Sequence, residues 1–319
     1  MSVAACLLLY SFAVATLSPW LLVRLTRAGI VPRLGVVAWL ATMVSVVATW
    51  VTATAFLVVS LTRYWNQPGR LAIACFAALR RLFDGGSGPV LQAGLVTLAA
   101  GATGALGLLS WRLARSLWRA VAHGRGHAER ARVIGRRIAG VDAVVVDAPE
   151  RAAYCVAGRP DTIVVTSAAL DSLTERHLQA VLAHERAHLA GRHHLVLAFA
   201  RALAVAIPGA ALFSTGARAI ARLLEMAADD AAARSHGSQT LLDALLALSL
   251  GARVPHGAVA ASGNDVLARA ERLAAPSAAR NRWKSRLLLT ATTLLMVGGP
   301  LVPAVLAAAG ATWCYPGVF

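Results

Sequence analysis

Lysine and carboxylate side chains are scarce in this 319-residue sequence. Lys284 is the only lysine, and only Asp84 of the fifteen Asp and Glu residues precedes residue 129. Chemistry that needs carboxylates is therefore confined to the second half of the chain. Charged residues make up 14% of the chain and apolar residues 58%, with four cysteines and a mean hydropathy of +0.63. This balance disfavours a disordered chain, a disulfide scaffold and an ordinary cytosolic enzyme.

Four apolar stretches are long enough to cross a hydrocarbon core, which takes about 20 helical residues. They cover residues 3–23, 35–61, 90–111 and 287–309. The first stretch has no basic segment before it and arginines after it, so it is interpreted as an uncleaved span and not as a signal peptide. We therefore predict a mainly α-helical integral membrane protein. Its expected parts are a membrane domain over residues 1–112, a soluble domain over 113–285, and a fourth span with a short tail over 286–319.

The placement of arginines predicts the orientation. They cluster over residues 112–137 and again over 280–286, on either side of the soluble segment. Because positive residues favour the cytoplasmic side, we expect a cytoplasmic domain on a bacterial cell membrane, with both termini outside. The basic run 112–137 lacks a recognition motif for nucleic acid and is attributed to contact with lipid. Outside, Arg70–Phe83 is a candidate amphipathic helix, and a disulfide bond between Cys75 and Cys314 stays open.

The soluble segment begins with three strand-like stretches. Val141–Val146, Ala153–Ala157 and Thr162–Thr166 are β-branched or alternate in polarity. The sequence Gly158-Arg159-Pro160-Asp161 is expected to join the last two as a hairpin. Next, Ser172-Leu173-Thr174-Glu175 has the form of a capping box, so a helix should begin near it. These features predict a small α+β domain.

The predicted helix carries the sequence His184-Glu185-Arg186-Ala187-His188, an H-E-x-x-H pattern. Residues four apart share a helical face, so both imidazoles can point at one ion. Glu185 can reach a water molecule on that ion and act as the general base. For this composition, chance predicts about 0.005 occurrences of the pattern, so it indicates a metal centre.

A second helix is expected to complete the site, because catalytic zinc usually takes three protein ligands and keeps one open position. Arg222–Ala233 is a strong helix former that carries Glu225 and Asp229 one turn apart. Glu225 can supply the third ligand, and Asp229 can accept a ring N–H from a ligating histidine and fix its tautomer. The alternative is a solvated acidic turn. We predict one zinc ion per chain, on His184, His188 and Glu225.

An apolar run between the two helices, Leu195–Phe213, bears on this prediction. One membrane crossing would place Glu225 on the opposite side from His184. Two crossings would need about 40 helical residues plus a turn, and only 36 residues separate His188 from Glu225. We therefore expect a helix that packs on the domain or lies against the bilayer without crossing it.

The motif at 184–188, followed by Glu225 and Asp229, resembles the gluzincin membrane peptidases of the HtpX type and, more closely, the BlaR/MecR antirepressor family. The stretches Asp161–His194 and Asp265–Ala274 are similar as well. So is the layout, with three spans, a cytoplasmic zinc domain and a fourth span. The resemblance implies a zincin-like fold, zinc on the three ligands, the motif glutamate as the base, and Asp229 as the orienting carboxylate of a ligand.

The chain departs from that family in two places. BlaR/MecR proteins often have an aspartate shortly after the motif, where this chain has His193. We expect His193 and its neighbour His194 to solvate or cap the helix end. About ten residues follow the last span, in place of an external penicillin-binding domain, so direct β-lactam sensing is not expected. The group that steadies the oxyanion stays open among Arg234, His236 and Tyr154.

Together these features predict a membrane zinc endopeptidase with a cytoplasmic active site, hydrolysing peptide bonds with a zinc-activated water. The peptide substrate is expected to add as a strand to the Ala153–Ala157 edge. The resemblance implies regulated cleavage of a winged-helix repressor of the BlaI/MecI kind, with no direct contact to nucleic acid. Two alternatives stay open. One is an HtpX-like quality-control protease of membrane proteins, and the other is a catalytically silent membrane signalling or scaffold protein.

Overall fold

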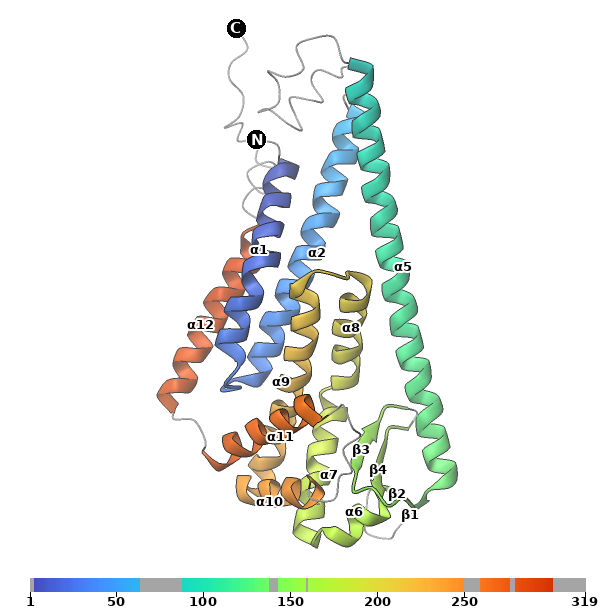
Figure 1. Cartoon of the computed structure of the whole chain (residues 1–319), viewed down its shortest axis with the longest axis vertical. Helices are drawn as coiled ribbons and strands as arrows, with labels where there is room; N and C mark the ends of the chain where they lie inside the picture. Colours follow the sequence, from blue (N-terminus) through green and yellow to red (C-terminus); the bar gives the residue numbers. More distant parts are fainter. Residues whose placement is uncertain are drawn as a thin grey trace.

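The computed structural model describes residues 3–63, 88–137, 143–158, 160–249, 259–275 and 279–300. These residues are mainly helical, with one small sheet. Long helices occupy one end of the elongated molecule, and the sheet and the shorter helices occupy the other end (Figure 1). We call these the helical half and the sheet half.

Three helices of the helical half are long and apolar enough to cross a bilayer. They are α1 (Val3–Thr26), α2 (Pro32–Arg63) and α5 (Gly88–Ile134). Helix α5 has 47 residues without a break, so it is about 70 Å long and exceeds the thickness of a bilayer. The expected boundary at residue 112 therefore lies inside one continuous helix, which reaches from the helical half to the sheet (Figure 1).

Helix α12 (Ala279–Gly298) contains the first part of the expected fourth span. Its apolar residues begin at Leu287, after a basic first half. Residues 301–309 of the expected span lie outside the described residues, so the fourth crossing stays a prediction. The candidate helix Arg70–Phe83 and the Cys75–Cys314 pair also lie outside the described residues.

The apolar run at 195–213 forms a helical hairpin. Helix α8 (His193–Ala206) and helix α9 (Ala211–His236) are joined by a turn over residues 207–210, which contains Pro208 and Gly209. Gly209 has a φ of 84°, which favours glycine. The hairpin returns to the sheet half, as expected for a run that does not carry the chain across a membrane. However, it packs between α2 and α5, and does not lie on the domain or flat against the bilayer (Figure 1).

A buried cluster holds α9 against α2. Trp39 and Met43 of α2 and Phe213 and Ile220 of α9 are all fully buried in it. The helices approach closely at Gly216, where a Cβ atom would overlap Met43 and lie 2.8 Å from a ring carbon of Trp39. This contact sets the position of α9 along its axis relative to α2. It therefore also sets the position of the acidic residues Glu225 and Asp229, which lie further along α9.

The sheet has the strand order β1-β2-β4-β3. Strand β4 pairs in parallel with β2 and antiparallel with β3, which confirms the expected hairpin. Strand β4 lies in the middle and is buried along its whole length, and β3 forms one edge. The strands are β1 (Arg136–Arg137), β2 (Val144–Val146), β3 (Ala153–Val156) and β4 (Thr162–Thr166). Strand β1 was not predicted, because two consecutive arginines carry no strand signal, and residues 141–142 of the predicted first strand are not described.

Four shorter helices complete the sheet half: α6 (Ser167–Ser172), α7 (Glu175–Ala190), α10 (Ser238–Ser249) and α11 (Val259–Ala274). Helix α7 begins where the capping signal predicts a helix. The residue that caps it is Thr174 and not Ser172, since the Thr174 hydroxyl accepts the His177 N–H at 3.3 Å. Ser172 instead ends α6, a short helix between β4 and α7.

Candidate metal centre

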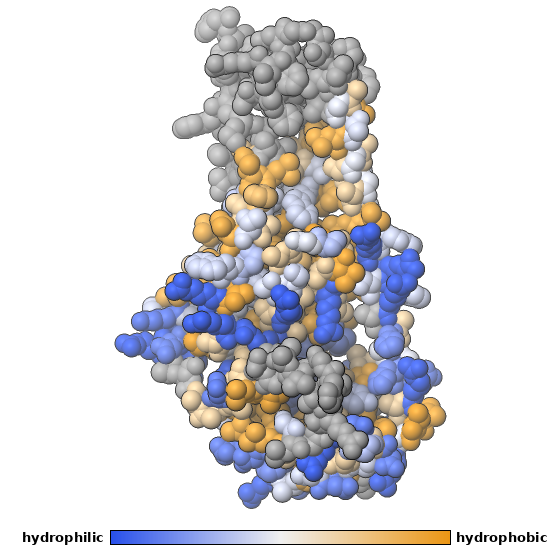
Figure 2. All heavy atoms as spheres, viewed as in Figure 1, coloured by the Kyte–Doolittle hydropathy of each residue, from blue (hydrophilic) through white to orange (hydrophobic). Residues whose placement is uncertain are grey.

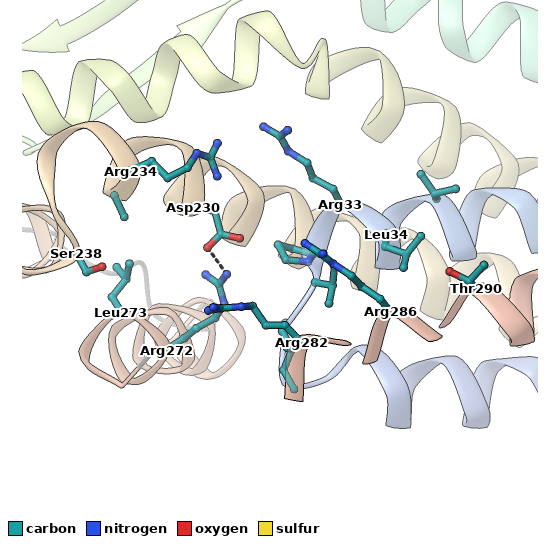
Figure 3. Close-up of a pocket in the computed structure, with 15 residues that line it drawn as sticks. Arg33, Leu34, Asp230, Arg234, Ser238, Arg272, Leu273, Arg282, Arg286 and Thr290 are labelled. Atoms are coloured by element: carbon teal, nitrogen blue, oxygen red, sulfur yellow. Dashed lines mark hydrogen bonds and ion pairs between the residues drawn. The ribbon is translucent and has the colours of Figure 1, made fainter. Parts of the chain in front are cut away.

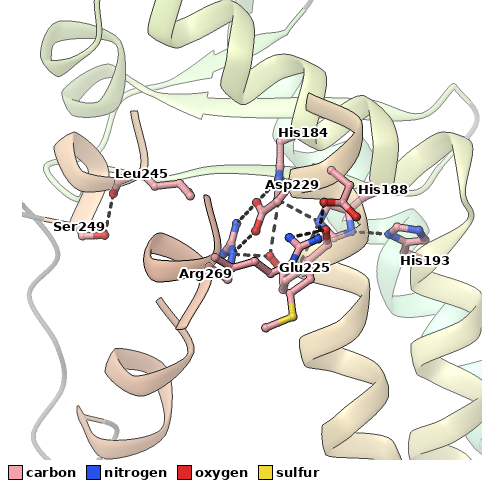
Figure 4. A network of polar contacts seen from close by, with 11 residues as sticks. His184, His188, His193, Glu225, Asp229, Leu245, Ser249 and Arg269 are labelled. Atoms are coloured by element: carbon pink, nitrogen blue, oxygen red, sulfur yellow. Dashed lines mark hydrogen bonds and ion pairs between the residues drawn. The ribbon is translucent and has the colours of Figure 1, made fainter. Parts of the chain in front are cut away.

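Helix α7 presents two histidines from one face. Its apolar side, with Leu178 and Leu182, packs on the sheet through Val165 of β4. The opposite face then directs His184 and His188 toward α9. Their Nε2 atoms lie 3.1 Å apart, and both rings are largely buried (Figure 4).

Helix α9 brings Glu225 to the same point. One carboxylate oxygen lies 3.5 Å from Nε2 of His184, and the other lies 3.5 Å from Nε2 of His188. The side chain of Glu225 is 42% exposed, so the cluster is open on this side. The structure therefore brings together the three residues predicted as ligands.

The spacing of these donor atoms fits a zinc ion. Two ligands at about 2.0–2.1 Å from a tetrahedral zinc ion lie roughly 3.3 Å from each other. The separations of 3.1 and 3.5 Å lie on either side of this value. Two imidazole nitrogens and a carboxylate, with one open side, are also the donor set of a catalytic zinc site. His184, His188 and Glu225 can therefore hold the ion that the motif implies.

Asp229 lies behind His184, as the spacing on α9 predicts. Its side chain is completely buried, and its Oδ1 atom is 3.1 Å from Nδ1 of His184. The ring nitrogen does not point straight at this oxygen, so the contact is a close ion pair and not a well-aligned hydrogen bond. With Nδ1 turned toward a carboxylate, Nε2 is left to face the cluster.

His193 has a partner that the sequence reading did not predict. It does not cap a helix end in solvent, because its Nδ1 atom lies 2.9 Å from Nδ1 of His188. The tight turn at Gly191 and Arg192 folds α8 back over α7, and Arg192 adopts the left-handed conformation with a φ of 49°. If His188 binds an ion through Nε2, its Nδ1 atom carries the proton and donates to His193.

Arg269 of α11 is the second residue that the sequence reading missed. Its Nε and Nη2 atoms donate to the two oxygens of Asp229 at 2.8 and 2.7 Å. Its Nη1 atom lies 3.2 Å from Glu225. Helix α11 is thereby bound to two acidic residues of α9 (Figure 4). The sequence Asp265–Ala274 resembles the family, but it does not indicate that Arg269 binds Asp229.

Glu185 faces β3 from the neighbouring position on α7. It is 8% exposed and interacts with the side chain and the backbone of Cys155. Since β3 is an edge strand, the carboxylate lies beside backbone groups that have no partner strand on their outer side within the described part of the chain. Burial raises the pKa of Glu185, and burial together with this carboxylate raises the pKa of Cys155 to about 12. Cys155 is therefore a neutral thiol.

The two motif histidines differ in protonation. Burial opposes a charge on His184, but Asp229 and Glu225 outweigh it and raise the pKa of His184 to about 9. Burial lowers the pKa of His188 to about 4, so this ring is neutral. An ion that binds here must displace the proton of His184, because histidine binds metals in its neutral form.

Arginine and histidine keep the carboxylates of α9 ionised. Burial would raise the pKa of Asp229, but Arg269 and His184 outweigh it and lower this pKa to about 2. Burial likewise opposes ionisation of Glu225, and its contacts with His184 and Arg269 lower its pKa. Both carboxylates therefore carry negative charge at neutral pH, as required for binding and orienting a cation.

The candidates for steadying an oxyanion lie away from the cluster. Tyr154 points to the face of β3 opposite Cys155, where its hydroxyl lies 3.4 Å from His127 of α5. Arg234 and His236 are nine and eleven residues beyond Glu225, or about 13 and 16 Å along α9. The arginine close to the cluster is Arg269. Helical spacing alone could have excluded Arg234 and His236 as oxyanion ligands. The position of Tyr154, in contrast, depends on how the sheet packs against α5.

Comparison with known families supports a metallopeptidase. Residues 125–249 match the family model described as peptidase family M48, a family of zinc metallopeptidases. The matched segment runs from the end of α5 through the sheet to α10, so it includes the motif helix and both acidic residues of α9. It ends before α11 and Arg269. Neither the curated proteins nor the solved structures contain a match to the chain.

Proposed function

We propose that the protein is a membrane-embedded zinc endopeptidase that cleaves peptide bonds beside β3. The observation that carries this proposal is the convergence of His184, His188 and Glu225 next to a buried glutamate and a sheet edge. A structural zinc site would have a fourth protein ligand and no buried base beside it. This cluster instead has an open side, at Glu225.

Each part of the site has a role in peptide hydrolysis. Zinc bound here would polarise the scissile carbonyl and lower the pKa of a bound water to about 7. Glu185 accepts the proton of the attacking water and returns it to the leaving amine. Its raised pKa suits that exchange, because a base with a pKa nearer neutrality both takes and gives protons. Asp229 and His193 hold the two motif rings in orientation.

The outer edge of β3 is the proposed binding surface for the substrate. An extended peptide added there gains backbone hydrogen bonds along Ala153–Val156. Since Cys155 touches Glu185, a peptide bond opposite this residue lies close to the base. Strand addition selects for unfolded or extended segments and not for a folded surface.

The proposed location is the cell membrane, with α1, α2 and α5 as spans and the sheet half in the cytoplasm. The long apolar helices support a location in the membrane, and the arginines of residues 112–137 support the proposed orientation. The proposed substrate is a winged-helix repressor of the BlaI/MecI kind, which rests on the resemblance to the BlaR/MecR family.

Cleavage of membrane proteins is a second candidate function. It is favoured by the position of the centre, because Glu225 lies only twelve residues, or about 18 Å, from Phe213 in the core of the helical half. A segment leaving the bilayer could reach the edge of β3 without a long connection. The two functions differ in substrate and not in chemistry.

Purified full-length protein in detergent tests the proposed chemistry. Cleavage of unfolded casein should stop with a chelator, return with zinc, and be absent in Glu185→Gln. Zinc content should fall from one ion per chain in His184→Ala, while the matched variant His177→Ala, on the same helix two turns earlier, should retain it. Undiminished cleavage by Glu185→Gln would refute the proposed role of this glutamate as the base. Absence of cleavage by the zinc-loaded wild-type protein would favour the catalytically silent scaffold instead. The matched carboxylate control is Glu271→Gln, which is exposed.

Two substrates then separate the proposed functions. One is the winged-helix repressor encoded nearest to this gene, and the other is a membrane protein with an unfolded cytoplasmic segment. Cleavage of the repressor at a single bond supports regulated proteolysis. Cleavage confined to the membrane protein would overturn that proposal in favour of quality control.

A further inference from the structure

A cavity of about 950 Å³ lies where the α1–α2 turn, α9, α11 and α12 meet (Figure 3). It is separate from the metal centre, whose three ligands do not line it. Five of its fifteen lining residues are arginines, which come from four different segments: Arg33, Arg234, Arg272, Arg282 and Arg286. Among the residues that line it, Asp230 is the only carboxylate.

The charges of this cavity are poorly balanced. Asp230 is already paired with Arg272, which also donates to the backbone oxygen of Gly29 at 2.9 Å. Arg33, Arg234 and Arg286 form no hydrogen bond or ion pair with the residues that the structure describes. Three arginines that line one cavity without an acidic partner create a strongly positive potential there. The cavity is therefore complementary to an anion with several oxygen acceptors.

One side of the cavity is apolar. It is formed by Ile30, Val31, Leu34 and Val37 around the start of α2, together with Leu273 of α11. The volume is also far larger than a small inorganic anion requires. A ligand that fills the space would need an anionic group and an apolar part.

The arginines stand at the level where the apolar helices begin. Arg33 is followed on α2 by a mainly apolar sequence without a charged residue up to Arg63, and Arg286 is followed on α12 by Leu287. Figure 2 shows hydrophilic side chains gathered across the middle of the molecule, below the apolar surface of the helical half. In a bilayer this level coincides with the lipid head groups, where the phosphates lie.

We propose that this cavity binds the phosphate-bearing head group of an anionic membrane phospholipid. The phosphate oxygens accept hydrogen bonds from Arg33, Arg234 and Arg286, and the start of an acyl chain lies against Leu34 and Val37. A phospholipid satisfies both the cationic and the apolar sides of the cavity, whereas free phosphate satisfies only the first. The inference rests on the proposed membrane location but not on peptidase activity.

Lipid binding to the full-length protein is the test. The protein is reconstituted in phosphatidylcholine nanodiscs with increasing phosphatidylglycerol, and retained lipids are counted by native mass spectrometry. The cavity variant is Arg33→Gln/Arg234→Gln/Arg286→Gln. Its control is Arg112→Gln/Arg115→Gln/Arg119→Gln, which removes the same charge from exposed positions on α5, where the sequence predicts contact with lipid head groups at an open surface. We expect retention of phosphatidylglycerol to be at least about tenfold weaker in the cavity variant. The control should lose only about two- to threefold, because its arginines do not converge on one bound head group.

Several outcomes would overturn the proposal. Equal losses in both variants would mean a general charge effect, and equal retention of phosphatidylcholine would remove the preference for an anion. Displacement of the lipid by millimolar inorganic phosphate would identify free phosphate as the ligand. If the triple variant does not fold, as judged by its melting temperature and zinc content, the single variant Arg286→Gln replaces it and should still lose affinity.

Failure of the proposed function would look different. Flotation with phosphatidylcholine vesicles tests membrane insertion alone, without any demand for an anionic lipid. The Glu185→Gln variant should bind phosphatidylglycerol as tightly as wild type, because the cavity contains no residue of the metal centre. Absence of peptidase activity from the wild-type protein, together with intact lipid binding, would therefore refute the first proposal and leave the second in place.

Discussion

Removal of the Arg269 guanidinium should strongly destabilise the sheet half. Asp229 is completely buried, and Arg269 donates to both of its oxygens while its own side chain is only 11% exposed. Loss of one partner from a buried ion pair costs about 3–5 kcal/mol, because the other charge is left without compensation. His184 remains beside Asp229, so we expect the lower end of this range for Arg269→Met, about 3 kcal/mol.

Thermal unfolding of the zinc-free protein in detergent, followed by circular dichroism, measures this effect without a contribution from metal binding. At about 2–4 °C per kcal/mol, Arg269→Met should melt roughly 6–12 °C below wild type. The control variant Arg176→Met changes an exposed arginine of α7 and should melt within about 2 °C of wild type.

A second substitution isolates the cause. In Arg269→Met/Asp229→Asn the buried negative charge is gone, so the double variant should melt above the single variant even though it carries one more change. A melting temperature of Arg269→Met close to that of wild type would refute the reasoning. So would a double variant that melts at or below the single one, because the loss would then come from packing of the long side chain and not from charge.

Three further predictions concern other parts of the molecule. In Gly191→Ala the new methyl group would collide with the His193 ring, whose Cδ2 atom lies 2.6 Å from the Cβ position. The affinity for zinc, measured by competition with a chelator, should therefore fall about tenfold. Unchanged affinity would mean that His193 does not orient a ligand. In Gly216→Val the side chain would push into Trp39, so the melting temperature should fall by an amount equivalent to about 1–3 kcal/mol, and a neutral result would contradict the close packing of α9 on α2. Gly126→Ala should raise the melting temperature by the equivalent of about 0.5–1 kcal/mol, because alanine favours a helix more than glycine does. The new methyl group has room, since no atom outside the adjacent turns of α5 lies within 4 Å of the Cβ position. A decrease would show that this part of α5 is not helical in solution.

The local elements were largely predictable from sequence patterns. The turn residues between β3 and β4 predicted a hairpin, and the H-E-x-x-H motif together with Glu225 and Asp229 predicted which side chains would converge. These predictions succeeded because helical spacing and turn chemistry act over a few residues. The position of Leu195–Phe213 was only half predicted, since chain length excludes a crossing but does not specify that the hairpin packs between α2 and α5.

The contacts that were missed depend on tertiary structure. Arg269 lies forty residues from Asp229, and no pattern within α11 indicates which carboxylate it binds. His193 meets His188 because Arg192 adopts a left-handed conformation, which is uncommon for an arginine and has no clear sequence signal. Strand β1 consists of two arginines that pair only because Val144 and Val145 lie alongside them.

The unbroken course of α5 has a mechanical consequence. The same helix that stands among the apolar helices continues directly into β1, with only Gly135 between them. A continuous hydrogen-bonded helix transmits twist and tilt along its length, because each turn is fixed to the next. A rotation of the Gly88 end of α5 is therefore transmitted to the strand pair β1–β2 some 70 Å away, unless the helix bends or unwinds between them.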